Sequence, residues 1–304
     1  MTPLTSAQTD EGQQHRLHKP GVAGSNPAAA TTHQICHTPA EEYHRWPEVS
    51  CSQLKALRES PLAFYFRFIA RSAPPHKSDA LAYGTLLHSW AEIGESEFWP
   101  KVVVAPDTLV TATGALSKKA DEWLARLEPG VIPISPADHA KLREQTKRLL
   151  DNPDVVEILE ASTDAEFNIR TTWNGHAVRC RVDGCTPAFF YDWKTTRDLN
   201  PMRDWWRSAK QFGYHLQSAF YQHCAEVAGW PRHRMRFIVT STVWPYDNAV
   251  GVLPEEWCEA GRKQCIRLLD ELRTRMDFDQ WANVNRSTEV QEFPFPAYAL
   301  KGEE

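Results

Sequence analysis

The chain has 304 residues, of which 42% are hydrophobic, and a formal net charge of -5 at pH 7. This length and apolar content suit one elaborated domain better than two independent ones. No apolar run approaches the roughly 20 residues of a transmembrane helix, and the N-terminus lacks the pattern of a secretory signal. We therefore expect a cytoplasmic protein without a membrane partner, whose seven scattered cysteines are reduced thiols.

The acidic total does not favour nucleic-acid binding, because contacts of Lys and Arg with phosphates dominate affinity for DNA. Between Arg203 and Arg236, however, six cationic residues accompany two carboxylates. A basic inner surface within an acidic protein would reconcile these two facts. The alternative is that these side chains are ordinary solvated positions on helices and strands.

Along the chain, residues 1–42 lack periodicity and predict a disordered leader. The hydrophobic periodicity then predicts helices at 50–68 with a break at Pro61, 78–93, 117–127, 136–159 after a Ser135 N-cap, 204–227 and 254–276. Strands are predicted at 101–105, 165–173, 176–183, 188–195 and 234–243. This order indicates an α/β (α+β) domain over 43–280, followed by a C-terminal tail or strap over 281–304.

The most informative stretch is Arg181-Val182-Asp183-Gly184, followed by Tyr191-Asp192-Trp193-Lys194 on the next predicted strand. Side chains alternate along a strand, so Asp192 and Lys194 share one face, while Tyr191 and Trp193 share the other. A turn is expected at Gly184, Thr186 and Pro187. The two aspartates can then converge on a divalent cation, with a lysine beside them. The alternative is two unrelated strand-end aspartates, since Asp favours turns.

Two further motifs accompany this pair of strands. They are Gly84-Thr85-Leu86-Leu87-His88 upstream and Gln211-Phe212-Gly213-Tyr214-His215-Leu216-Gln217-Ser218-Ala219-Phe220-Tyr221 downstream, which contains a Gln-x-x-x-Tyr pattern at Gln217 and Tyr221. The ordered set, from about Val49 to about Asp279, resembles the PD-(D/E)xK nuclease superfamily. Within its RecB-like branch, the chain is similar to phage-type exonucleases of the exodeoxyribonuclease VIII kind. Val182 stands where the superfamily name has proline. The resemblance implies a restriction-endonuclease-like core, with a central mixed β-sheet flanked by helices and with helical additions.

The resemblance also implies roles for individual residues. The expected metal ligands are His88, Glu166, Asp183, Asp192 and the backbone carbonyl of Trp193. Mg²⁺ is the expected ion, and the imidazole makes Mn²⁺ plausible. The expected catalytic residues are Asp183, Asp192, Lys194 and Gln217, and the expected DNA contacts are Arg181, Lys210, Tyr214 and Tyr221.

Each role has an alternative. A helical histidine such as His88 is more often a packing residue, and Lys194 could be an edge-strand lysine with a solvated head. Asp164 and Glu160 compete with Glu166 as the upstream acid. The stripe from Lys210 to Tyr221 could be a core boundary.

The implied activity is metal-dependent hydrolysis of linear double-stranded DNA from an end, in the 5′ to 3′ direction. The implied partners are DNA ends, a single-strand annealing protein, and further copies of the chain in a toroid. A catalytically silent DNA-binding protein on the same fold is one rival. A single-strand nuclease of the iron-sulfur type is another, but after the core only Cys258 and Cys265 accompany Cys224, so we expect no cluster.

Overall fold

The computed structural model describes residues 33–74, 79–230 and 234–282. The strands in these ranges are β1 (Gln34–Cys36), β2 (Val49–Ser50), β3 (Val102–Val104), β4 (Ile132–Ile134), β5 (Asp164–Trp173), β6 (His176–Cys185), β7 (Phe190–Thr196), β8 (Arg236–Ser241) and β9 (Asn248–Val252). The α-helices are α1 (Ala40–Arg45), α2 (Cys51–Glu59), α3 (Pro61–Phe64), α4 (Asp79–Ile93), α5 (Glu95–Phe98), α6 (Asp121–Leu124), α7 (Pro136–Leu150), α8 (Pro153–Glu160), α9 (Pro201–Asp204), α10 (Trp206–Gln211), α11 (Tyr214–Val227) and α12 (Glu255–Phe278). A π-helical turn over Tyr65–Ile69 continues α3.

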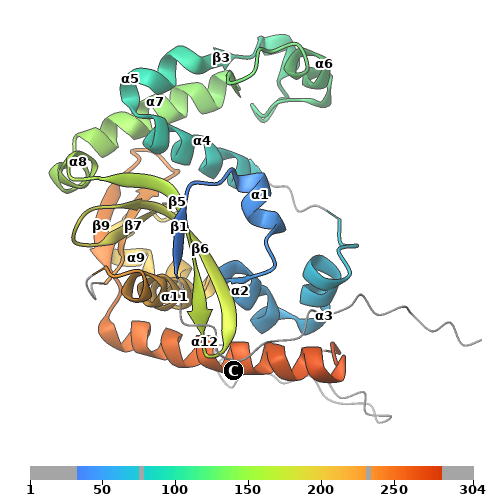
Figure 1. Cartoon of the computed structure of the whole chain (residues 1–304). Helices are drawn as coiled ribbons and strands as arrows, with labels where there is room; N and C mark the ends of the chain where they lie inside the picture. Colours follow the sequence, from blue (N-terminus) through green and yellow to red (C-terminus); the bar gives the residue numbers. More distant parts are fainter. Residues whose placement is uncertain (1–32, 75–78, 231–233, 283–304) are drawn as a thin grey trace, which may run out of the picture. The chain divides into compact units, whose positions relative to one another are not determined.

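Seven of the described strands form one mixed sheet (Figure 1). Its order is β1-β5-β6-β7-β8-β9, and β2 pairs with β6 off this path. Neighbours are antiparallel except for β7 with β8 and β2 with β6, which are parallel. The short strands β3 and β4 pair separately. The predicted central mixed sheet flanked by helices is confirmed. No helix of the described residues is both long enough and apolar enough to span a membrane.

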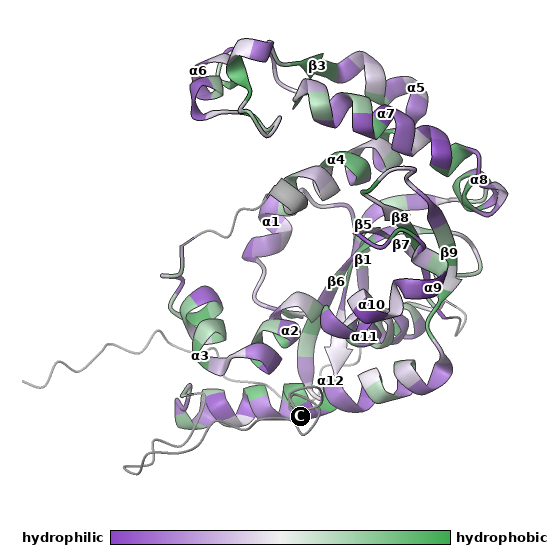
Figure 2. Ribbon diagram, turned by 180° about the vertical axis from the view of Figure 1, so that it is seen from behind, coloured by the Kyte–Doolittle hydropathy of each residue, from purple (hydrophilic) through white to green (hydrophobic). Residues whose placement is uncertain are grey.

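Two clusters of buried side chains cover the two faces of this sheet. The first joins β5, β6, β7 and β8 to α2, α11 and α12, and it contains Phe190. The second joins β7 and β8 to α4, α7 and α8, and it contains Tyr191 and Trp193. The flanking helices carry green and purple residues side by side in Figure 2, as amphipathic helices do. The alternation predicted for β7 therefore divides its side chains between two cores.

Two helices predicted as continuous are divided. The helix expected at 136–159 becomes α7 and α8, because Pro153 begins α8 and the Asn152 side chain caps it. The helix expected at 204–227 becomes the end of α9, then α10 and α11. Gly213 separates α10 from α11 with a φ of +64°, a conformation that glycine adopts readily. Lys210 therefore lies on α10 and does not continue the stripe of Tyr214 and Tyr221 on α11.

The predicted turn after β6 is also shorter than expected. Gly184 lies within β6, where it pairs with Tyr191 of β7. A side-chain carbon at residue 184 would come within 2.1 Å of the Tyr191 ring, so the close packing of that ring requires glycine. The turn begins at Thr186, whose amide donates to the Phe189 carbonyl at 2.9 Å.

The leader predicted over 1–42 is wrong from residue 33 onward. Strand β1 pairs with β5, and the Asn168 side chain donates to the Cys36 carbonyl at 3.2 Å. Residues 1–32 lie outside the described ranges. At the other end, Trp281 is buried and stacks on Phe64 at a centroid distance of 5.6 Å. The remainder of the predicted strap, 283–304, lies outside the described residues.

Candidate metal and catalytic centre

The centre lies where β6 and β7 separate. The two strands pair only at Gly184 with Tyr191 and at Cys185 with Phe190. Beyond this point the Asp183 carboxylate accepts a hydrogen bond from the Trp193 amide at 2.9 Å. A side-chain acceptor thus takes the place of a backbone carbonyl in the ladder, which satisfies the buried amide. This bond holds the Asp183 carboxylate against the backbone of Trp193, the residue that follows Asp192.

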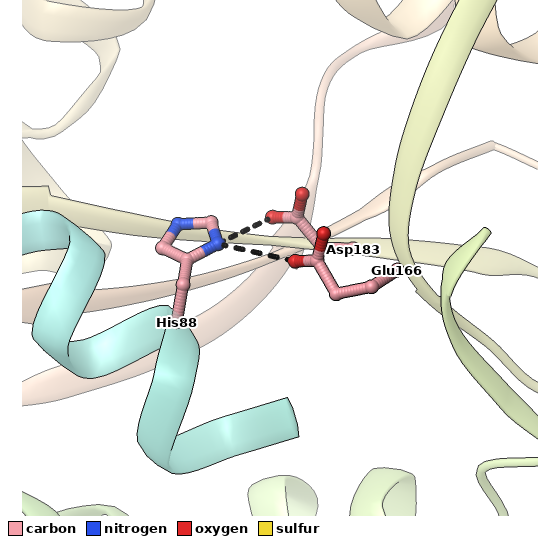
Figure 3. Close-up of side chains that lie close together, drawn as sticks. All are labelled: His88, Glu166 and Asp183. Atoms are coloured by element: carbon pink, nitrogen blue, oxygen red, sulfur yellow. Dashed lines mark ion pairs between the residues drawn. The ribbon is translucent and has the colours of Figure 1, made fainter. Parts of the chain in front are cut away.

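Three predicted metal ligands come together from three elements (Figure 3). His88 is on α4, Glu166 on β5 and Asp183 on β6. The His88 Nδ1 atom lies 3.5 Å from Asp183 Oδ2 and 4.0 Å from Glu166 Oε1. One potential ligand atom from each residue lies within 4.8 Å of the other two. Two carboxylates and one imidazole at these distances can hold Mg²⁺ or Mn²⁺.

Glu166 reaches this group from an unusual backbone conformation. Its φ is +53°, the left-handed region that non-glycine residues avoid at a cost of about 1–2 kcal/mol. Glu166 Oε2 accepts a hydrogen bond from Arg181 Nε at 2.6 Å. Its competitor Asp164 instead pairs with His37 at 3.1 Å. The local strain therefore falls on the acid that faces His88.

The charges of this group depend strongly on one another. Burial, followed by the Asp192 charge, raises the pKa of Asp183 to about 7. Burial alone would lower the pKa of His88, but the carboxylates of Asp183 and Glu166 outweigh it and raise that pKa to about 9. Burial also opposes ionisation of Glu166, yet His88 and Arg181 lower its pKa. Crowded carboxylates of this kind favour an added cation, so the donor set fits a divalent metal.

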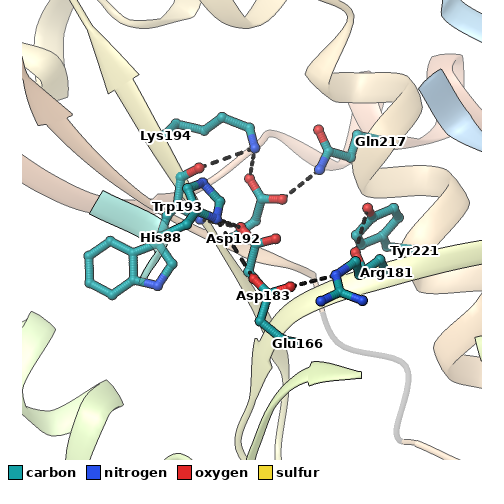
Figure 4. Close-up of polar contacts among 9 residues, drawn as sticks. All are labelled: His88, Glu166, Arg181, Asp183, Asp192, Trp193, Lys194, Gln217 and Tyr221. Atoms are coloured by element: carbon teal, nitrogen blue, oxygen red, sulfur yellow. Dashed lines mark hydrogen bonds and ion pairs between the residues drawn. The ribbon is translucent and has the colours of Figure 1, made fainter. Parts of the chain in front are cut away.

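Asp192 and Lys194 form a second, more enclosed network (Figure 4). The Asp192 side chain is 1% exposed and forms an ion pair with the Lys194 ammonium. Lys194 also donates to the Trp193 carbonyl at 3.2 Å. Gln217 Nε2, on α11, donates to Asp192 Oδ1 at 2.5 Å. Burial would lower the pKa of Lys194, but Asp192 and Asp183 outweigh it and hold that pKa above its ordinary value.

The predicted ligands therefore divide into two sets. His88, Glu166 and Asp183 present their ligand atoms to one another. Asp192 and the Trp193 carbonyl instead contact Lys194, although the Trp193 amide links the two sets through Asp183. The alternation of side chains predicted that Asp183 and Asp192 would approach each other, and the resemblance added His88 and Glu166. The alternation did not predict which partners each carboxylate would take.

The predicted DNA contacts occupy different surroundings. Arg181 donates to Glu166 and, through Nη1, to the Thr38 carbonyl at 2.7 Å. The Tyr221 hydroxyl donates to the Arg181 carbonyl at 2.8 Å. The Tyr214 ring centroid lies 5.1 Å from the Lys194 ammonium, whereas Lys210 is exposed on α10. The polar groups of the Arg181 and Tyr221 side chains thus bond to other groups of the protein, whereas the Lys210 side chain faces solvent.

One residue that the sequence did not indicate also belongs to this region. Lys55 on α2 donates to Gln217 Oε1 at 3.4 Å, and its ammonium lies 4.8 Å from the Tyr214 ring centroid. Its neighbours Leu54 and Leu57 are buried in the first core. Nothing in the periodicity of α2 separates Lys55 from an ordinary solvent-facing lysine.

Comparison with known proteins identifies the family. A sequence model described as "PDDEXK-like domain of unknown function (DUF3799)" matches residues 50–285. The chain belongs to this family. The predicted membership of the PD-(D/E)xK nuclease superfamily is therefore confirmed. No curated protein sequence gives a significant match.

A solved structure shows the same fold. It is the crystal structure of a protein from Eubacterium rectale described as a "Putative exonuclease". It matches with a TM-score of 0.56 and 14% sequence identity, covering 88% of this chain and all of the other. This likeness concerns the fold alone, and it agrees with the restriction-endonuclease-like core predicted from the motifs.

Proposed function

We propose that this chain is a metal-dependent deoxyribonuclease that hydrolyses linear double-stranded DNA from an end. The observation that carries the proposal is the adjacency of the His88, Glu166 and Asp183 donors to the Asp192–Lys194 pair. The first set offers the oxygen and nitrogen ligands of a divalent cation, and the second offers a fixed ammonium. Membership of a PDDEXK-like family supports a nuclease.

The protein's own groups have distinct tasks in this proposal. Mg²⁺ or Mn²⁺ bound by His88, Glu166 and Asp183 would supply Lewis-acid activation of water and of the scissile phosphate. Lys194, oriented by Asp192, stabilises negative charge that develops on the phosphate. Gln217 holds the Asp192 carboxylate in place, which leaves the ammonium preorganised. Asp192 is adjacent and can complete the ligand set.

Gly84 supports the approach of a substrate to this centre. It lies one helical turn before His88, and a side-chain carbon there would meet no described atom within 4 Å. Packing within the protein therefore does not require glycine at this position, although glycine costs helix stability of about 1 kcal/mol relative to alanine. In this proposal, glycine at residue 84 leaves room for a DNA backbone beside His88.

The finer features of the proposal rest on the resemblance to end-dependent exonucleases. They are 5′ to 3′ polarity, a toroid of several copies, and delivery of the remaining 3′ strand to an annealing protein in recombination. The basic segment from Arg203 to Arg236 supports a DNA path within an acidic chain.

The decisive experiment compares end-labelled linear duplex with the same DNA as a covalently closed relaxed circle, in Mg²⁺, Mn²⁺ or EDTA. We expect the linear form to be consumed only with metal while the circle survives. Asp183→Asn should abolish cleavage, and Asp164→Asn, on the same sheet but paired with His37, should retain it. If the closed circle is cut as fast as the linear duplex, the protein is an endonuclease and not an exonuclease. Absence of cleavage of both DNAs in both metals would refute the nuclease.

A further inference from the structure

Two lysines from different parts of the chain lie over one tyrosine ring. The ammonium groups of Lys55 on α2 and Lys194 on β7 lie 4.8 Å and 5.1 Å from the Tyr214 ring centroid. Gln217 also connects them, because it accepts from Lys55 and donates to Asp192, the partner of Lys194. Lys55 is thus tied to the candidate centre through two side chains.

The two lysines differ in how their charge is balanced. Lys194 has the carboxylate of Asp192, whereas no carboxylate of the described residues lies within 4 Å of the Lys55 ammonium. Lys55 is half-buried on a helix whose neighbouring leucines enter the core. Burial lowers its pKa, and the positive charges of Lys194 and Arg58 act in the same direction, against the opposing effects of Cys51 and Asp192. A cation in this position is costly to the free protein unless an anion joins it.

A purely structural role accounts poorly for this charge. The bond from Lys55 to Gln217 is long, at 3.4 Å, and it uses one of three ammonium donors. A neutral donor could orient the Gln217 amide equally well. The Lys55 ammonium keeps its charge despite the desolvation cost, and it lies beside a centre proposed to hydrolyse phosphodiester bonds. This position suits the binding of a phosphate oxygen of the substrate.

We propose that Lys55 is a phosphate-binding residue that contacts a backbone phosphate of DNA next to the bond being cut. The inference rests on the proposed nuclease function and adds a contact to it. Lys55 and Lys194, whose ammonium groups both lie over the Tyr214 ring, would then receive successive parts of one anionic strand. The carbonyl of Gln217 holds Lys55 in position until the phosphate arrives.

The test measures duplex DNA affinity across a salt series, with Ca²⁺ replacing Mg²⁺ and gels verifying that the DNA stays intact. Lys55→Met should weaken binding about 10-fold or more. It should also reduce the slope of log K against log salt by about 0.9, the value of one phosphate contact. The melting temperature of the free protein should stay unchanged or rise, because an uncompensated charge has been removed. Lys55→Arg should restore the salt slope.

Lys263→Met is the matched control, because Lys263 is an exposed lysine on α12 that pairs with Glu259. It should leave affinity, slope and melting temperature unchanged. If Lys55→Met instead lowers the melting temperature and keeps the salt slope of the wild type, Lys55 only supports Gln217 and the inference is overturned. Wild-type protein that neither binds nor cuts DNA would refute the proposed function as well, so the two failures are distinguishable.

Discussion

The His88, Glu166 and Asp183 group and the Asp192–Lys194 pair lie side by side but balance charge differently. In the first group two carboxylates face one imidazole, Glu166 also pairs with Arg181, and the side chains of the group are 14–32% exposed. In the second, a carboxylate that is 1% exposed has its own ammonium and an amide donor. The open half is where the proposed metal would bind, whereas the carboxylate and the ammonium of the enclosed half pair with each other. Substitutions in the two halves should therefore change stability in opposite directions.

The largest effect should come from Asp192→Ala. It removes the counter-ion of Lys194, and breaking a buried ion pair costs about 3–5 kcal/mol. We expect loss of nearly all cleavage and a clear fall in the free energy of unfolding, measured by urea denaturation in EDTA. The double variant Asp192→Ala, Lys194→Ala leaves no unpaired charge and should recover much of the stability. An Asp192→Ala protein as stable as the wild type would show that the enclosed half is not a closed pair.

Lys194→Ala should affect catalysis more than binding. Loss of one preorganised electrostatic group typically lowers the rate about 10²- to 10³-fold. Single-turnover cleavage should show this decrease, while calorimetry should still detect metal binding, because His88, Glu166 and Asp183 are untouched. Lys263→Ala, which changes an exposed lysine on α12 that pairs with Glu259, serves as the control. Loss of metal binding in Lys194→Ala would instead make Lys194 a support of the metal site.

Asp183→Asn should stabilise the metal-free protein, in contrast to Asp192→Ala. Because burial and Asp192 raise the Asp183 pKa from 3.8 to about 7, the folded state holds this proton more tightly than the unfolded state. The contribution of the protonated Asp183 carboxyl to folding stability is complete below 3.8, its pKa in the unfolded state. This contribution is lost as the pH rises through about 7, its pKa in the folded state. In EDTA at pH 8 the variant should gain at least about 1 kcal/mol, or about 2–4 °C in melting temperature.

This gain should shrink as the pH is lowered and vanish near pH 4, where the wild-type carboxyl is also protonated. Metal binding by the wild type, followed by calorimetry, should weaken below pH 7 for the same reason. A pH-independent gain would mean that the asparagine improves packing and does not relieve carboxylate repulsion.

Part of this centre follows from the sequence because it depends on local periodicity. Asp192, Lys194 and the buried Trp193 sit on alternate faces of β7, as two-residue alternation requires. The order of motifs added His88 and Gln217, which lie on distant helices. The resemblance predicted that these helices pack near the strands of the site, and periodicity alone could not predict this.

The remaining features depend on tertiary contacts that have no local signal. The hydrogen bond from the Trp193 amide to Asp183 exists because two strands separate, and the left-handed backbone of Glu166 is held by Arg181 and His88. Lys55 looks like a solvated helix position until α11 packs beside it. Such residues become visible only when the distances between elements are known.

The smallest effect concerns Tyr221, for which the resemblance implies a DNA contact. Its hydroxyl donates to the Arg181 carbonyl, and the Arg181 side chain holds Glu166. Tyr221→Phe should therefore cost about 0.5–1.5 kcal/mol of stability, the usual value of one hydrogen bond. DNA affinity and its salt dependence should remain those of the wild type, because the hydroxyl faces the protein. Tyr214→Phe, which keeps the ring beside Lys194, is the control. A 10-fold loss of DNA affinity in Tyr221→Phe at unchanged melting temperature would show that the Tyr221 hydroxyl contacts DNA.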